Sequence, residues 1–243
     1  MRDYKEEFKK RVQFIKEVLN ASSADGIIYG NSGGKDSTLV GILCKAACEN
    51  TLGIIMPCDS VRNLSLDKDD AIQIAQKYNI ETRTVDLTEI KRSVITTISK
   101  ISHPTESAQR NIAPRLRMTT LYTIAASENR IVAGTGNRSE GYMGYFTKWG
   151  DGAYDFNPIS DLTVKEVYEF LIYLKAPESI IKKPPSAGLF DGQTDEKEMG
   201  ITYTEIDEFL LNGNVNEKNK RIINKFHQAG EHKRLPAIQY NAE

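Results

Sequence analysis

The chain has 243 residues, enough for one large α/β domain with a full hydrophobic core. Its 32 basic and 33 acidic side chains nearly cancel, so no overall field draws it towards nucleic acid or a membrane surface. No apolar run approaches the roughly 18 residues of a spanning helix, and the charged N-terminus MRDYKEEFKKR lacks a signal-peptide core. We expect a cytoplasmic protein with no membrane or nucleic-acid partner.

Apolar spacing predicts helices that alternate with strands. Phe8, Val12, Ile15 and Leu19 follow one another at helical intervals, which indicates an amphipathic helix over 4–20. The other predicted elements are helices at 37–49, 67–78, 88–101 and 112–128 and strands at 26–29, 52–56, 83–87 and 130–133. This alternation is typical of a doubly wound parallel sheet with helices on both faces.

In such a sheet ligands bind beyond the carboxyl ends of the strands, so the loops after Tyr29, Met56, Leu87 and Ala133 are expected to meet at one crevice. Two long Gly-rich segments, 135–160 and 182–202, are read as functional or mobile loops.

The three cysteines, Cys44, Cys48 and Cys58, form an odd count without a C-x-x-C pair. A disulfide framework is therefore not expected. Cys44 and Cys48 lie four residues apart among small apolar residues, so we interpret them as core packing.

The most informative segment is IIYGNSGGKDSTLV, residues 27–40, in which a strand leads through a Ser-Gly-Gly loop into a helix. Such glycines let a backbone approach a ligand closely, and the N–H groups at a helix start favour an anion. A carboxylate, here Asp36, is tolerated beside phosphate when a cation such as Mg²⁺ lies between them. The segment predicts a phosphate-binding loop.

Two commoner nucleotide motifs are excluded. The pattern G-x-x-x-x-G-K-[ST] fails because Tyr29 stands where its first Gly is required and Asp36 stands where its hydroxyl residue should be. No G-x-G-x-x-G follows a predicted strand, so the dinucleotide-binding fingerprint is absent as well.

SGGKDS instead resembles the pyrophosphate loop (PP-loop) of the ATP pyrophosphatases, which cleave ATP between its α and β phosphates. Over about residues 8–235 the chain resembles ammonia-dependent NAD synthetase, which amidates deamido-NAD. The segments that carry this resemblance are SGGKDS (32–37), NIAPRLRMTTLY (111–122), GTGNRSE (134–140), GYFTKWGDGAYDFNPISDL (144–162), KPPSAGL (183–189), DEKEMGITYTEID (195–207) and HKR (232–234).

The resemblance implies a set of site residues. For ATP they are Gly30, Asn31, Ser32, Gly33, Gly34, Lys35, Asp36, Ser37, Thr135, Lys165 and Ser186. For magnesium they are Asp36 and Glu140; for deamido-NAD they are Arg115, Lys148, Asp155, His232 and Lys233; and the catalytic set is Asp36, Lys35 and Lys148. Ordinary surface or loop-stabilising roles remain open for Arg115, Lys148, Asp155, His232 and Lys233.

Three positions depart from the family pattern. Lys35 stands where Gln is frequent, and Val164 stands where the family often has an ATP-contacting Lys, with Lys165 next to it. Pro114 stands where Ala is usual and is expected to start its helix.

The aromatic residues Tyr142, Tyr145, Phe146 and Trp149 suit either a stacking surface for a ring or core packing.

The implied reaction converts ATP, deamido-NAD and ammonia into NAD, AMP and pyrophosphate through an acyl adenylate. The chain is read as a single domain over 1–243, too short for an added glutaminase domain, so free ammonia or a separate partner supplies the nitrogen. A homodimer is expected from the resemblance.

Two rival functions stay open. The first is tRNA thiolation, which the near-neutral charge and the lack of a C-x-x-C pair disfavour. The second is a module that senses ATP without turnover, which has little use for two metal-binding acids.

Overall fold

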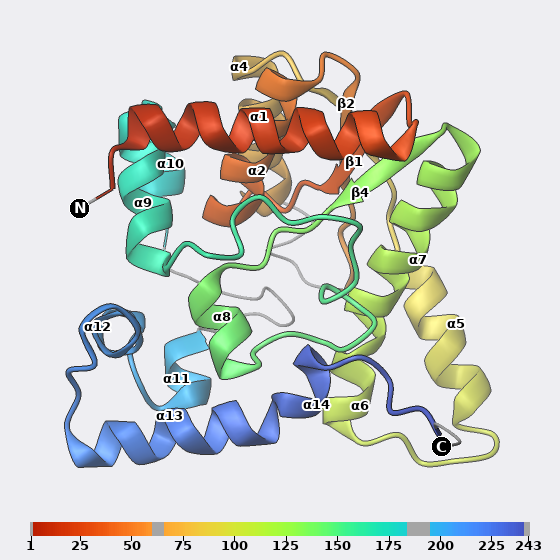
Figure 1. Ribbon diagram of the computed structural model, residues 1–243. Coiled ribbons are helices and arrows are strands. Elements are labelled where there is room, and N and C mark those ends of the chain that lie inside the picture. The colour runs from red at the N-terminus through yellow and green to blue at the C-terminus, as the bar shows by residue number, and fades with distance from the viewer. Residues whose placement is uncertain (1, 60–65, 184–194, 241–243) are drawn as a thin grey trace.

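The sheet is parallel throughout, with the strand order β3-β2-β1-β4. Figure 1 labels β1, β2 and β4. The computed structural model describes residues 2–59, 66–183 and 195–240. The strands are β1 (Gly26–Gly30), β2 (Thr51–Ile55), β3 (Glu81–Thr84) and β4 (Arg130–Ala133). The predicted doubly wound α/β fold is confirmed.

Helices fill both faces of this sheet and continue beyond it. They are α1 (Tyr4–Ser22), α2 (Lys35–Ala47), α4 (Leu66–Lys77), α5 (Thr88–Ile98), α6 (Glu106–Arg110), α7 (Ile112–Ser127), α8 (Arg138–Met143), α9 (Val164–Tyr173), α10 (Glu178–Ile181), α11 (Asp195–Met199), α12 (Tyr203–Asn212), α13 (Glu217–Ala229) and α14 (Glu231–Arg234). None of the helices in the described ranges is long and apolar enough to cross a membrane.

Successive residues of β1 serve two different cores. Ile27 and Tyr29 pack with α1, α2 and α9, whereas Ile28 points to the other face and packs with α7 residues such as Ala125. All three strand residues are fully buried. A parallel strand that is covered on both faces has a continuous apolar sequence, and the run IIY therefore identifies β1 as such a strand.

A third core lies away from the sheet and joins the C-terminal helices to α8. Its buried members are Met143, Val164, Met199, Ile201, Tyr203, Ile206 and Ile223. No element is predicted from the sequence after Ala133, so this helical layer, seen below the sheet in Figure 1, is a finding of the structure.

Some predicted boundaries differ from the structure. β3 ends at Thr84 and not at Leu87, because it is an edge strand with mostly exposed side chains, and the apolar residues that follow continue the backbone pairing outside the regular ladder. The helix α7 begins at Ile112, so Pro114 occupies its third position. There a proline is tolerated, since first-turn N–H groups have no partner within the helix.

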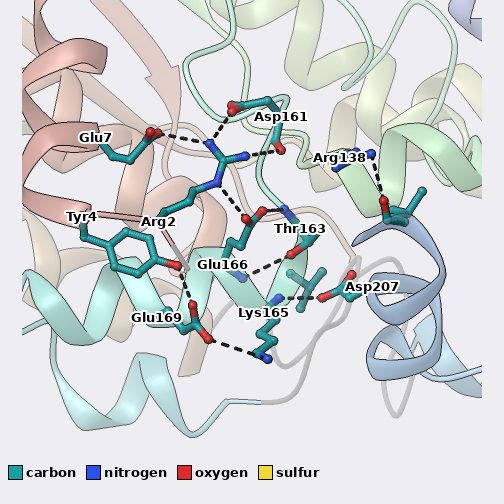
Figure 2. A network of polar contacts seen from close by, with 12 residues as sticks. Arg2, Tyr4, Glu7, Arg138, Asp161, Thr163, Lys165, Glu166, Glu169 and Asp207 are labelled. Carbon is teal, nitrogen blue, oxygen red and sulfur yellow. Dashed lines mark hydrogen bonds and ion pairs between the residues drawn. The ribbon is translucent and has the colours of Figure 1, made fainter. Parts of the chain in front are cut away.

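An ion-pair network anchors the N-terminus to the start of α9. Arg2 donates to Glu166 at 2.7 Å and to Asp161 at 2.9 Å (Figure 2). Arg11, buried beside it, donates to both oxygens of Asp161, at 2.6 and 2.9 Å, and to Glu7 at 2.7 Å. The network therefore fixes α1 to the chain that precedes α9.

Arg11→Met is expected to lower the free energy of unfolding by about 2 kcal/mol at pH 7, because two carboxylates lose a shared donor. Burial opposes the charge of Asp161, but the bonds from Arg11 hold the pKa of that carboxyl below its usual value. The contribution of Asp161 to the free energy of unfolding is therefore complete above the ordinary Asp pKa of about 3.9. It is lost as the pH falls through the lower pKa of the folded state.

Urea unfolding of the wild type and Arg11→Met at pH 7 and in acid measures this difference. Lys10→Met, at an exposed position of the same helix, is the control and is expected to cost less than about 0.5 kcal/mol. Equal costs for the two variants, or a cost for Arg11→Met that does not fall in acid, would contradict the prediction.

Candidate active site

A cleft of about 1020 Å³ opens at the carboxyl edge of the sheet. The loops after β1, β2 and β4 line it, as the sequence predicts. The loop after Leu87 does not, because β3 is the edge strand and its loop lies away from the strand pair β1 and β4. Ten predicted site residues within the described ranges line this cleft: Gly30, Asn31, Ser32, Gly34, Lys35, Asp36, Ser37, Thr135, Glu140 and Lys233.

Gly33 shapes the phosphate loop although it does not line the cleft. Its φ is +68°, and a Cβ there would lie 2.2 Å from the carbonyl oxygen of Asp67 in α4. Both the backbone angle and the close approach require glycine. The loop is further held by Asn31, whose side-chain amide donates to the Ala71 carbonyl at 3.0 Å.

The phosphate loop places the N-terminus of α2 at the cleft. α2 starts at Lys35 after an extended Gly34, which has no side chain to cap the first N–H groups. The hydroxyls of Ser32 and Ser37 lie 3.1 Å apart beside this end. The first-turn N–H groups, the helix dipole and the hydroxyl donors together form an anion site suited to phosphate.

The two predicted metal ligands come together at this helix end. Asn137 connects them: its side-chain amide donates to Asp36 at 3.1 Å, and its backbone N–H donates to Glu140 at 3.3 Å. The side chain of Asn137 also accepts from the Glu140 N–H, so a capping box fixes Glu140 at the start of α8. The predicted loop 135–160 thus contains a short helix that positions one acid.

Lys35 lies between these acids. Its ammonium group is 2.6 Å from Asp36 and 3.7 Å from Glu140, and the residue is only 6% exposed. Burial opposes its charge, but the two carboxylates raise the pKa of Lys35 above its ordinary value. Burial and the charge of Asp36 raise the pKa of Glu140.

The acid pair suits magnesium. Mg²⁺ is usually held by one or two carboxylates together with water and substrate phosphates. The described part of the chain offers no group of three or more His, Cys, Asp or Glu side chains placed to hold a metal. Asp36 and Glu140 beside a phosphate site therefore fit a magnesium ion that phosphates help to hold.

Lys183 is a site residue that the sequence analysis leaves without a role. Its ammonium group lies 2.7 Å from Asp67 and 2.7 Å from Asp70, and 3.3 Å from the Gly33 carbonyl. It therefore ties the phosphate loop to α4. The segment KPPSAGL contains Lys183, but a sequence motif does not show which lysine faces the loop. Ser186 of the same motif lies outside the described residues.

The two arginines of α7 differ in placement. Arg115 is exposed, does not line the cleft, and reaches the Lys148 carbonyl at 3.4 Å. Arg117 lines the cleft and donates to the carbonyl of Met56, at the end of β2, at 3.2 Å. Burial lowers the pKa of Arg117, yet a guanidinium stays charged in a protein. Arg117 is thus the cation that α7 offers to a ligand.

Two of the predicted substrate residues, Lys148 and Lys233, are bonded to backbone carbonyls. Lys148 donates to the His232 carbonyl at 2.5 Å, and Lys233 donates to the carbonyls of Gly144 and Phe146 at 2.8 Å each. Burial lowers the pKa of Lys233. Lys233 lines the cleft, whereas Lys148 and the exposed His232 do not.

A backbone contact joins the tail to α8. Gly144 follows α8 with a φ of +65°, and a Cβ on it would lie 2.7 Å from the Cα of Gly230. Arg234 adds bonds to the carbonyls of Gly141 and Tyr142 at 3.4 and 3.2 Å. The tail thus covers the carbonyl end of α8, while Glu140 stands near its other end.

Asp155 and Lys165 are not brought into the cleft. Asp155 accepts from the Val132 N–H at 2.7 Å and from the Tyr122 hydroxyl at 3.1 Å, which fixes the chain after β4. Lys165 is exposed and its ammonium group turns to Glu169, 4.0 Å away (Figure 2). The expected role of Lys165 in ATP binding stays a prediction, since this side chain does not line the cleft.

The aromatic cluster divides between several roles. Tyr142 stacks on His227 with ring centroids 4.1 Å apart, and the Tyr145 hydroxyl bonds to Glu198. Phe146 lines the cleft, whereas Trp149 is 55% exposed beside the ammonium group of Lys148. Only part of the cluster is therefore available to a bound ring.

The parallel sheet, the open end of α2 and the acid pair define an α/β enzyme built to bind a nucleotide by its phosphates. The NAD synthase family model matches residues 7–237. An NH(3)-dependent NAD(+) synthetase from Carboxydothermus hydrogenoformans is 45% identical over 240 residues, or 97% of this chain and 98% of that protein.

Solved structures agree with this match. An NMN synthetase from Francisella tularensis has 37% identity and a TM-score of 0.94, with both chains covered in full. An NH3-dependent NAD synthetase from Campylobacter jejuni, in complex with the nitrate ion, has 30% identity and a TM-score of 0.81 over 99% of this chain and 100% of that one. The chain belongs to the family of NH3-dependent NAD⁺ synthetases and is a ligase.

Gly33→Ala is expected to lower the free energy of unfolding by more than about 2 kcal/mol, because a left-handed angle and a clash with α4 add together. Gly34→Ala is the matched control: it has a φ of −95°, and among the described residues its Cβ would come near only the Ser32 hydroxyl, at 3.3 Å. It is expected to cost under about 0.5 kcal/mol. Urea unfolding of both variants checks this, and equal losses would show that α4 does not constrain Gly33.

Proposed function

We propose that the protein catalyses the last step of NAD biosynthesis, the ATP-dependent amidation of deamido-NAD by ammonia, with AMP and pyrophosphate as the other products. The observation that carries the proposal is the acid pair of Asp36 and Glu140 at the open end of α2. Family membership supports the same reaction class.

The chemistry follows from the nicotinate carboxylate, which is a poor acyl donor because its leaving group would be oxide. In the proposed reaction this carboxylate attacks the α-phosphate of ATP, and pyrophosphate departs into the loop formed by Ser32, Gly34 and Ser37. Ammonia then displaces AMP from the acyl adenylate. The chain supplies placement and fixed dipoles, which stabilise charge without reorganisation.

The residues of the cleft have separate parts in this proposal. The hydroxyls of Ser32 and Ser37 and the N–H groups of α2 receive the departing pyrophosphate. Asp36 and Glu140 would hold magnesium, which when bound neutralises charge that builds on the phosphates. Arg117, on the far side of the cleft, offers a charge to the anionic substrate.

Nicotinate mononucleotide is a second candidate substrate. The observation that favours it is the TM-score of 0.94 to the NMN synthetase from Francisella tularensis, against 0.81 to the NAD synthetase from Campylobacter jejuni. The relative with 45% identity, an NAD(+) synthetase, favours the dinucleotide. Both substrates present the same carboxylate, so the adenylation chemistry does not distinguish them.

A side-by-side assay separates the two. Purified protein would receive ATP, magnesium, ammonium and either deamido-NAD or nicotinate mononucleotide, with the amide and AMP quantified together. The proposal expects equal amounts of NAD and AMP and the larger kcat/KM with deamido-NAD. A larger kcat/KM with the mononucleotide would replace the proposal by NMN synthesis. AMP without either amide would point to another acyl substrate.

Arg117→Gln is expected to lower kcat/KM about 10- to 100-fold, because a charged hydrogen bond to an anionic substrate is lost. Arg115→Gln, on the exposed side of the same helix, is the matched control and is expected to lower it less than about threefold. Steady-state kinetics under identical magnesium and ATP give both values. The reverse ranking would restore Arg115 as the substrate contact.

A homodimer is part of the proposal. Ile90 and Ile98 in α5 are 48% and 37% exposed, and with Val94 between them they form an apolar stripe at four-residue intervals on one side of the helix. Contiguous exposed apolar surface of this kind marks association sites. Light scattering is expected to give twice the 27.3 kDa of one chain, and Ile90→Asp/Ile98→Asp to give the monomer mass. A wild-type monomer would contradict this.

A further inference from the structure

The Lys35 ammonium group does not lie where the sequence of a phosphate loop predicts. A lysine in a phosphate loop is expected to point at phosphate. Here the ammonium group turns into the protein, 2.6 Å from Asp36 and 3.7 Å from Glu140, beside the rings of Tyr168 at 6.0 Å and Tyr203 at 5.9 Å. It therefore faces the acid pair from a buried position.

Three carboxyl groups of the described residues surround this ammonium group. Asp36, Glu140 and the buried Asp195 are the carboxyl groups that face one another here, and Asp195 accepts from the Tyr203 hydroxyl at 3.1 Å. Within the described ranges, Lys35 is the one cation that forms an ion pair with Asp36 or Glu140. Without it, two carboxylates would face each other at low dielectric with no counter-charge, which is unfavourable.

We propose that Lys35 is a tethered counter-ion that stands at the position of a divalent cation and competes with it for Asp36 and Glu140. The inference rests on the proposed function, in which these acids hold magnesium. An ammonium group this close to both carboxylates repels a second cation from the same oxygens. The chain therefore keeps the acid pair partly neutralised and in place without metal, and binds a free divalent cation weakly until phosphates add negative charge.

The test is direct binding of Mn²⁺, a spectroscopic substitute for Mg²⁺, to the protein without nucleotide at pH 8. Electron paramagnetic resonance counts the free ion. The variant Lys35→Gln keeps the approximate length of the side chain and removes its charge. Its Mn²⁺ affinity is expected to rise tenfold or more, since even a well-screened charge repels a divalent ion at about 4 Å by more than that.

Three further variants make the result specific. Lys35→Arg retains the charge and is expected to bind Mn²⁺ as weakly as the wild type. Lys10→Gln removes an exposed cation on α1 and is expected to leave Mn²⁺ affinity unchanged. Adding Asp36→Asn to Lys35→Gln is expected to abolish the gain, which identifies the acid pair as the binding site.

Equal or weaker Mn²⁺ binding by Lys35→Gln would overturn the proposal, as would the absence of binding by both proteins. If the variant unfolds in EDTA, folding restored by Mg²⁺ would support it. Unfolding in both conditions would show that Lys35 acts by packing, and would overturn it. The amidation assay on the wild type keeps the proposed function separate. NAD formation by the wild type, with unchanged Mn²⁺ affinity in Lys35→Gln, rejects the counter-ion alone. Tighter Mn²⁺ binding by Lys35→Gln, with no NAD from the wild type, rejects only the substrate.

Discussion

The bond from Asn137 to Asp36 is the contact on which the cleft depends. It joins the start of α2 to the start of α8, two helices that follow β1 and β4. These strands are neighbours in parallel register, with Tyr29 opposite Ala133, so both loops leave the sheet at the same height. Because Asn137 also caps α8, one side chain sets the position of both acids. The sheet brings the loops together, and this amide sets their spacing.

The walls of the cleft are held by charges that are bonded within the protein. Lys183 draws the phosphate loop onto α4, and Arg11 draws the chain before α9 onto α1. In each case a cation is bonded to two or more oxygens from separate elements. Such contacts add modest stability, but they fix geometry, and preorganised geometry is the main requirement of a transfer between phosphates and a carboxylate.

Sequence patterns predict the parts that local physics determines. The buried run IIY and the glycines before α2 specify a strand, a turn and a helix start, so the fold and the phosphate loop follow from them. The direction in which a side chain points does not follow from these sequence patterns. Lys35 occupies a ligand-binding loop yet turns inward, and Arg117, two positions from Arg115, takes the place in the cleft. These choices depend on tertiary neighbours such as Tyr168 and the end of β2, which lie far away in the sequence.

The contact between Gly144 and Gly230 packs the tail directly against the end of α8. α8 has six residues and spans about 9 Å, so Glu140 lies within a short distance of this contact. The position of one proposed metal ligand therefore depends on the packing of residues far along the chain. Lys233 and Glu140 lie on the wall of the cleft that α8 and the tail form, whereas Asp36 lies on the wall formed by α2 and α4. The Asn137 amide bonds one wall to the other.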